Sequence, residues 1–353
     1  MASKRKTLPA DFEQQLKTAS LDELIAVFQR CRLDARGGYT KHTAIGFLDC
    51  PDALIQWLVA QGLDVDEGDL DGRTPFAERA AFGRVAQMPL LISLGADIER
   101  RDDDGATPLH AAAGHHQPEA VRLLLAEGVE VDVLDDEDRT PLEYGLIRTS
   151  NIDITEMAEV AGLLLEAGAA VSDAMREEVE RIGSTFEFHR AGFNPDTVEE
   201  TAAGLARLCA LFGVEVPGER RMHDGVSPIR VPAGDWRDQH QALWTLLVPS
   251  MGAAQTVQGE VIRVSGRIAI EIHDNGGANW DRDYRRMLAA FPAWLAMGHA
   301  LPDDALAQAR TLAEDLRDGA GDLEEVERLL ELAVAWVALN PSPRALGPVT
   351  WKR

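Results

Sequence analysis

The chain has 353 residues, of which 45% are hydrophobic and 27% are charged, and it contains three cysteines. These proportions are ordinary for a folded globular protein and exclude wholesale disorder and a disulfide-stapled miniprotein. No run of residues approaches the roughly 18 consecutive apolar residues that a membrane span requires. The cysteines form no CxxC pair, and no apolar segment follows the basic start of the chain, so we expect a cytoplasmic protein without a structural zinc site.

The formal net charge of −24 is concentrated in one part of the chain. Residues 38–171 hold 26 acidic and 9 basic residues, whereas residues 1–37 have a net charge of +2 and residues 172–353 a net charge of −9. An acidic surface repels nucleic acid and anionic membranes and speeds the encounter with basic partners. We therefore expect a protein partner, and neither a nucleic acid nor a membrane.

Residues 1–37 predict two short helices. The first begins near Asp11, and the second covers 21–31, where Leu21, Leu24, Ile25 and Phe28 recur at helical spacing. We expect these residues to form an N-terminal helical cap.

A repeat with a period of 33 residues occupies residues 38–171. The turn motif at 71–75 (DGRTP) recurs at 104–108 (DGATP) and at 137–141 (EDRTP). In each copy a threonine before proline supplies a helix N-cap and a preset φ. Glycine in the first two copies suits a turn with positive φ, and Asp138 takes that place in the third motif, where aspartate tolerates left-handed backbone.

The period and these motifs resemble the ankyrin repeat, most closely in residues 104–136, where TPLHAAA is followed by VRLLLAEG. The resemblance implies stacked helix pairs with short β-hairpin fingers. The copy at residues 38–70 is degenerate, and Arg79 stands where a small residue normally lets helices pack closely. Residues 8–37 then resemble an N-terminal capping repeat, and residues 172–215 are expected to be C-terminal capping helices.

Residues 216–235 are rich in glycine and proline and predict a linker. Residues 236–340 predict a separate helical domain, with helices near 237–248, 254–274, 281–297, 303–318 and 322–339, followed by a tail over 341–353. The predicted fold class is all-α: an ankyrin-repeat solenoid of helix pairs with short β-hairpin fingers, followed by a C-terminal helical bundle. Residues 241–285 resemble a segment of uncharacterised bacterial proteins, some of them encoded near toxin–immunity loci. The composition also fits a bacterial origin, since lysine is confined to Lys4, Lys6, Lys17, Lys41 and Lys352 and arginine supplies the other basic residues.

The predicted helix at 254–274 has an apolar stripe and, opposite it, charged residues that include Glu260, Arg263 and Arg267. One interpretation is a solvated ladder of ion pairs, and the other is a semi-buried polar network that shapes a binding groove. Trp280 leaves two similar alternatives. It is either an aromatic anchor of the bundle or part of a binding surface together with the two arginines.

Acidic residues gather on the predicted fingers. Some belong to the ankyrin pattern itself, whereas Asp66, Glu67, Glu99, Asp103, Asp136 and Asp138 exceed it. Because fingers and inner helices form one extended concave surface in such solenoids, we expect this surface to bind a basic protein. The predicted partner-binding residues are Asp66, Glu67, Asp71, Glu99, Asp103, Asp104, Asp136, Glu137, Asp138, Arg263, Arg267 and Trp280.

The sequence contains no recognisable catalytic or nucleotide-binding motif. His110 is the usual histidine of the repeat, and His115 and His116 lack a third convergent ligand, so no metal and no cofactor are predicted. The leading hypothesis is a non-enzymatic protein-binding module, in its most specific form an immunity protein that neutralises a basic bacterial toxin. The alternatives are a scaffold or regulator with the C-terminal helical domain as a second docking site, and an enzyme with a site in residues 236–297.

Overall fold

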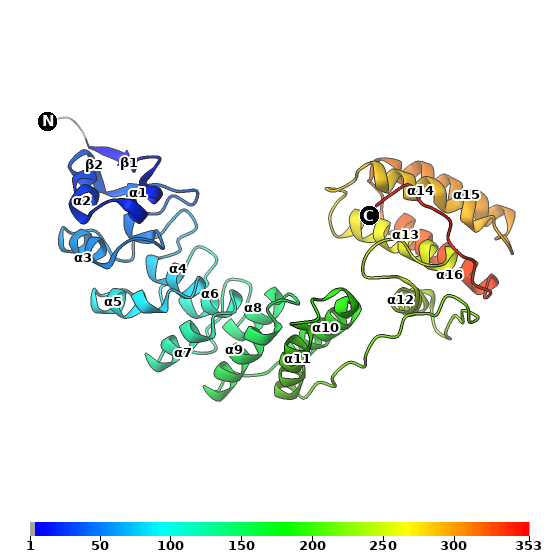
Figure 1. The fold of residues 1–353 in the computed structure, drawn as a ribbon, viewed down its shortest axis with the longest axis horizontal. Helices are drawn as coiled ribbons and strands as arrows, with labels where there is room; N and C mark the ends of the chain where they lie inside the picture. Colours follow the sequence, from blue (N-terminus) through cyan, green and yellow to red (C-terminus); the bar gives the residue numbers. More distant parts are fainter. Residues whose placement is uncertain (1–3, 353) are drawn as a thin grey trace. The chain divides into compact units, whose positions relative to one another are not determined.

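The computed structural model describes residues 4–352, which fall into two compact units. The first unit extends to residue 186 and includes 194–217, and the second consists of 187–193 and the residues from 218 onward. The described residues are mostly helical, as predicted, and their two strands lie at the N-terminal end (Figure 1). Residues 1–3 and 353, the extreme ends of the predicted cap and tail, lie outside the described residues.

The N-terminal end combines two helices with a two-stranded parallel sheet. The helices α1 (Phe12–Thr18) and α2 (Leu21–Arg30) lie in the chain between β1 (Arg5–Thr7) and β2 (Cys31–Arg36). The rings of Phe12 and Phe28 meet edge to face in the core beneath the helices. The predicted cap contained no strands, because β1 is only three residues long and entirely exposed, so it has no alternating apolar pattern.

The repeats stack as pairs of helices, in two rows (Figure 1). The first helices of the pairs are α4 (Pro75–Ala81), α6 (Pro108–Gly114) and α8 (Pro141–Arg148), and the second helices are α5 (Met88–Ser93), α7 (Pro118–Ala126) and α9 (Ile154–Glu166). The predicted threonine is the N-cap of each first helix, directly before its proline. Its side chain accepts a hydrogen bond from the backbone N–H of the third helical residue. The helices α10 (Asp173–His189) and α11 (Val198–Phe212) follow, and α11 packs against α9.

The degenerate copy lacks the first helix of its pair. A single 3-10 turn, η1 (Ala44–Gly46), precedes α3 (Asp52–Ala60). Arg79 of α4 is fully buried against this turn, and its guanidinium donates to the carbonyl oxygens of Gly46 and Phe47 at 3.3 and 2.9 Å. The arginine therefore donates to carbonyl groups of a turn that stands where the other copies have a helix.

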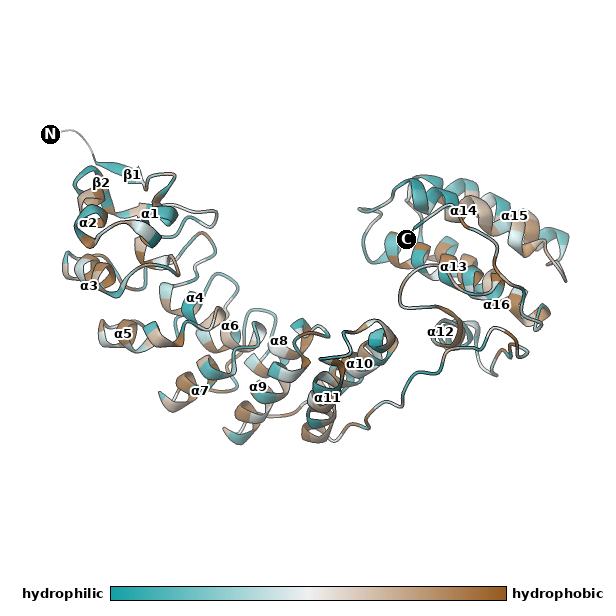
Figure 2. Ribbon diagram, in the orientation of Figure 1, coloured by the Kyte–Doolittle hydropathy of each residue, from teal (hydrophilic) through white to brown (hydrophobic). Residues whose placement is uncertain are grey.

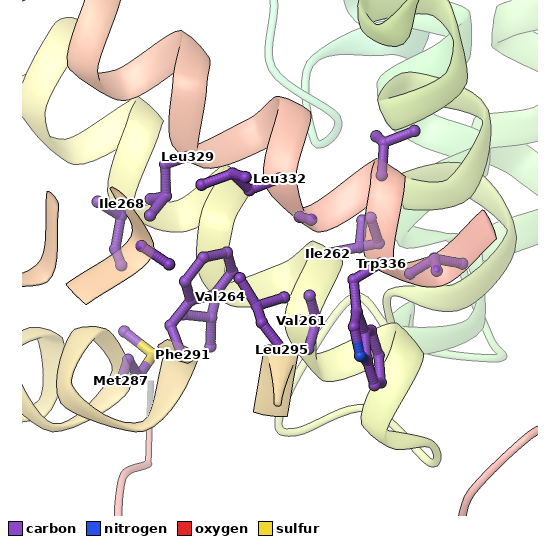
Figure 3. Close-up of a cluster of buried hydrophobic side chains, with 14 of the residues drawn as sticks. Val261, Ile262, Val264, Ile268, Met287, Phe291, Leu295, Leu329, Leu332 and Trp336 are labelled. Atoms are coloured by element: carbon purple, nitrogen blue, oxygen red, sulfur yellow. The ribbon is translucent and has the colours of Figure 1, made fainter. Parts of the chain in front are cut away.

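The second unit is a helical bundle whose central helix is α13 (Val257–His273). The other helices are α12 (Trp236–Leu247), α14 (Arg282–Leu295), α15 (Asp303–Asp315) and α16 (Leu323–Leu339). Val261, Val264 and Ile268 of α13 lie in one buried cluster with Phe291 of α14 and Leu329 of α16 (Figure 3). Hydrophobic and hydrophilic residues alternate along the helices of both units, as expected for helices with one buried face (Figure 2).

Two segments that the sequence places outside the bundle pack within the second unit. Ile229, in the predicted linker, is 2% exposed and belongs to the core cluster. Trp351, in the predicted tail, packs edge to face on Trp294 and donates its indole N–H to Glu260 at 2.9 Å. Glycine and proline predict irregular backbone, but they do not determine whether that backbone lies against a core.

Candidate protein-binding surface

One aspartate closes the turn of each finger. The carboxylate of Asp69 accepts hydrogen bonds from two backbone N–H groups of its own turn, both at 3.0 Å, and Asp102 and Asp135 repeat this arrangement in the next two fingers. Burial raises the pKa of Asp135, but hydrogen bonds from the side chain and backbone of Arg139 outweigh burial and leave this pKa below its ordinary value. These three acids therefore shape the fingers.

A second set of acids joins each repeat to the next. The carboxylate of Asp66 accepts the backbone N–H of Asp97 at 3.0 Å, and Glu99 accepts the N–H of Glu130 at 2.8 Å. Burial raises the pKa of Asp66. Asp66 and Glu99 were predicted to bind a partner because they exceed the repeat pattern, yet the structure engages both in contacts between repeats.

Five exposed carboxylates remain at the finger tips, and we call this set the acidic ridge: Asp71, Asp103, Asp104, Asp136 and Asp138. Within residues 4–352 no ion pair joins them to a basic side chain. Successive fingers are tied by backbone hydrogen bonds, from the N–H of Asp103 to the carbonyl of Asp71 at 2.9 Å and from the N–H of Asp136 to the carbonyl of Asp104 at 3.0 Å. The backbone therefore holds the members of the ridge in adjacent positions.

Two other predicted acids already have basic partners. Glu67 forms an ion pair with Arg36, and Glu137 forms one with Arg139 at 2.7 Å. Both pairs are partly exposed, so each offers a partner less unbalanced charge than the ridge does.

Glycine is required where one finger stacks on the next. A Cβ at Gly72 or Gly105, whose φ angles are +74° and +75°, would collide with the carboxylate of Asp103 or Asp136 in the following finger. Asp138 adopts the predicted left-handed conformation, with φ of 59°. This position tolerates a side chain because the chain enters α10 at Asp173 and no further finger stacks there.

The first helices also present an aromatic cluster that the sequence analysis missed. The rings of Phe82 and His115 lie 5.4 Å apart, and Phe82 is 48% exposed. The guanidinium groups of Arg139 and Arg148 lie 5.0 and 4.2 Å from the ring centre of Tyr144. Phe82, His115 and Arg148 recur at a step of 33 residues at the C-terminal ends of the first helices, which is the signal in the sequence that could have indicated them.

Two histidines of the repeats, His110 and His116, have structural hydrogen bonds. The Nδ1 of His110 accepts the backbone N–H of Thr107, and its Nε2 lies 3.0 Å from the carbonyl of Arg139. Burial lowers the pKa of His110, so the ring is neutral at pH 7. His116 is buried, with its Nε2 3.1 Å from the hydroxyl of Thr149. The described part of the chain contains no group of three His, Cys, Asp or Glu side chains that could hold a metal ion.

Arg263 is not part of a surface, so its prediction as a partner-binding residue is wrong. Its guanidinium is fully buried and pairs with the equally buried Glu260 at 2.6 Å. Glu260 also accepts the N–H of Ala254 and the indole N–H of Trp351, both at 2.9 Å. The charged face of α13 is therefore a buried polar network at this position, because the C-terminal segment supplies partners that a solvated ladder would not need.

Arg267 and Trp280 are partly buried. The ring of Trp280 stacks on Tyr284 with centroids 5.1 Å apart, and its indole N–H donates to the carbonyl of Arg317 at 2.9 Å. Trp280 also packs against the core cluster of the second unit. These contacts favour its interpretation as an anchor of the bundle.

Residues 80–173 match the family model for ankyrin repeats, in three copies. No curated protein matches the chain. A helix of the length and apolarity that a bilayer requires is not found in residues 4–352. Ankyrin repeats are protein–protein interaction modules and are typically non-enzymatic. The stacked helix pairs, the linked fingers and the family match agree that residues 80–173 are ankyrin repeats.

Proposed function

We propose that the acidic ridge binds a basic protein. The observation that carries this proposal is the set of five exposed carboxylates on fingers that the backbone holds together. Backbone hydrogen bonds from Asp103 to Asp71 and from Asp136 to Asp104 keep neighbouring finger tips together, so a lysine or arginine of the partner would face carboxylates from two fingers at once. A surface with charge of one sign also raises the association rate with a partner of opposite charge.

The specific partner class that we propose is a nuclease toxin, which makes the chain an immunity protein. A nuclease binds phosphates through a cationic face, and an acidic ridge seated on that face would exclude the nucleic acid. The acidic composition of residues 38–171 supports this assignment, because it is opposite in sign to a phosphate-binding face.

The test begins with the partner itself. Immobilised full-length chain is used to capture proteins from the organism that encodes it, and the association and dissociation rates of the purified partner are then measured at low and physiological salt. We expect a basic partner, and Asp103→Lys with Asp136→Lys should slow association at least about tenfold at low salt, while dissociation changes much less. The difference should shrink as salt rises, because screening acts over about 8 Å at physiological ionic strength.

The matched control is Glu127→Lys with Glu166→Lys. These two exposed glutamates lie at the C-terminal ends of α7 and α9, so the control makes the same change of net charge away from the fingers. An equal loss of association rate in both double variants would locate the effect in net charge and refute the ridge as the interface. If the partner is a nuclease, the native chain should inhibit its cleavage and the ridge variant should not. A partner that is neutral or acidic would overturn the proposal.

A further inference from the structure

The most exposed large hydrophobic side chain in residues 4–352 is that of Tyr39, which is 98% exposed. It lies at the tip of a short loop whose ends, Gly37 and His42, form an antiparallel bridge. The backbone of this loop is left-handed at Gly38, with φ of 72°, and at Lys41, with φ of 59°. A side chain so fully in solvent contributes little to the stability of the fold.

Three contacts hold this loop in place. The N–H of Gly37 donates to the carbonyl of His42 at 2.9 Å, and the hydroxyl oxygen of Thr40 lies 2.7 Å from the Nε2 of the same histidine. The Nζ of Lys41 donates to the carbonyl of Gly38 at 3.2 Å. The tyrosine therefore stands on an ordered loop, and little conformational entropy is lost when a partner contacts it.

The loop is the first member of the row of fingers. The N–H of Leu70 donates to the carbonyl of Thr40 at 3.0 Å, just as the N–H of Asp103 donates to the carbonyl of Asp71 between the next two fingers. Leu70 precedes Asp103 by one 33-residue period and is 63% exposed. The row that carries the acidic ridge therefore begins with two exposed apolar side chains, Tyr39 and Leu70.

We propose that Tyr39 is an anchor of the interface with the basic partner, seated in an apolar pocket at the edge of the partner's cationic face, with Leu70 beside it. This inference rests on the proposed function, because the partner is the basic protein that meets the acidic ridge. Residues 37–42 contain no acid and continue the same row of fingers, so a protein that covers the ridge reaches an apolar end there. Tyrosine is also one of the residue types that dominate binding energies at interfaces.

The anchor is a feature of this chain rather than of the repeat pattern. The loop lies outside residues 80–173, which match the family model, and it belongs to the degenerate copy. Leucine stands at position 70, where the two following fingers have Asp103 and Asp136. The change from acid to apolar side chains along one row predicts a partner surface that changes from cationic to apolar in the same direction.

The anchor and the ridge should act on different rate constants. Charge attraction acts before the two proteins touch, so the ridge affects association and its effect falls with salt. Apolar burial exists only in the docked complex, so its loss speeds dissociation and depends little on salt.

The captured partner, once purified, is used to measure both rates for native chain and variants at low and physiological salt. Tyr39→Ser should raise the dissociation rate at least about tenfold at both salt concentrations, as expected for the loss of a hot-spot side chain. Tyr39→Phe keeps the ring and should dissociate nearly as slowly as the native chain. Ile152→Ser is the matched control, because Ile152 is 82% exposed in the loop between α8 and α9 rather than in a finger, and it should leave both rates unchanged. Thermal melts should be the same for all variants, since both positions are exposed.

Tyrosine nitration localises the contact. The chain has three tyrosines, and Tyr39 is 98% exposed whereas Tyr284 is 6% exposed. Tetranitromethane should therefore modify Tyr39 first in the free chain, and the bound partner should protect it.

The outcomes separate this inference from the function on which it rests. If the ridge variant loses association rate but a folded Tyr39→Ser dissociates at the native rate, the anchor is overturned and the proposed function stands. Equal nitration of Tyr39 in the free and the bound chain overturns the anchor in the same way. A neutral or acidic partner overturns the proposed function and, with it, the basic partner assigned to the anchor.

Discussion

Replacing Arg79 with methionine removes the guanidinium that links α4 to the degenerate copy and keeps most of the apolar side chain. The carbonyl of Gly46 loses the donor from Arg79, whereas the carbonyl of Phe47 keeps the N–H of Cys50 at 3.0 Å. One orphaned carbonyl costs about 1–3 kcal/mol, and each lost bond from a charged donor adds to that cost. Burial of the charge works in the opposite direction, since desolvation is the main cause that lowers the pKa of Arg79. We expect a net loss of about 2–4 kcal/mol in the free energy of unfolding.

Urea unfolding and amide hydrogen exchange measure this effect. Because each repeat is stabilised through its neighbour, exchange should accelerate over residues 44–60 and much less beyond α6. Arg84→Met is the control. Arg84 is half exposed in an ion pair with Asp49 at 3.6 Å, so its loss should cost less than about 0.5 kcal/mol. Equal stability of the two variants, with unchanged exchange over 44–60, would refute the role assigned to Arg79.

Two further outcomes follow from single residues. Gly105→Ala should destabilise the first unit by about 1–3 kcal/mol, because the φ of Gly105 is positive and Asp136 occupies the space of the new Cβ. Asp138→Gly should be neutral or slightly stabilising, because Asp138 also has a positive φ. Denaturant midpoints compare the stabilities of the two variants, and an unchanged midpoint for Gly105→Ala would contradict the stacking of the fingers. Burial lowers the pKa of His240 from 6.5 to about 4 in the folded chain, so the folded state binds fewer protons than the unfolded state between these pH values. About 3 kcal/mol of the free energy of unfolding, fully present above pH 6.5, should therefore be lost as the pH falls toward 4. Tryptophan fluorescence reports the unfolding, since six of the seven tryptophans lie in residues 236–351. If the stability of His240→Gln depends on pH as strongly as that of the native chain, His240 is not the source of the loss.

The parts of the fold that depend on local signals could be predicted. The 33-residue step, the Thr-Pro helix starts and the left-handed turn position all specify structure within a few residues of themselves. The helix predicted near 322–339 starts as expected, because Asp322 and Glu325 form a capping box at the start of α16. The predicted helix at 254–274 begins three residues later, at Val257, because the side chain of Thr256 caps it.

The candidate site was less accessible to sequence reasoning, because charge alone does not distinguish one acid from another. Asp66 and Asp103 both exceed the repeat pattern, but Asp66 accepts a backbone N–H of the next repeat whereas the carboxylate of Asp103 is exposed on the ridge. The excess of acid was visible in the sequence, and its division between contacts among repeats and free surface was not.

The sequence by itself determined the repeats, their helix starts and turns, and the acidic character of residues 38–171, since each of these depends on residues that are neighbours along the chain. The tertiary structure alone decided which charges are buried. Arg79 meets Gly46 from a distance of 33 residues, and Glu260 meets Trp351 from 91 residues away. Whether a charged side chain is solvated or enclosed depends on such distant partners, because desolvation is set by everything that packs around a group rather than by its own place in the chain.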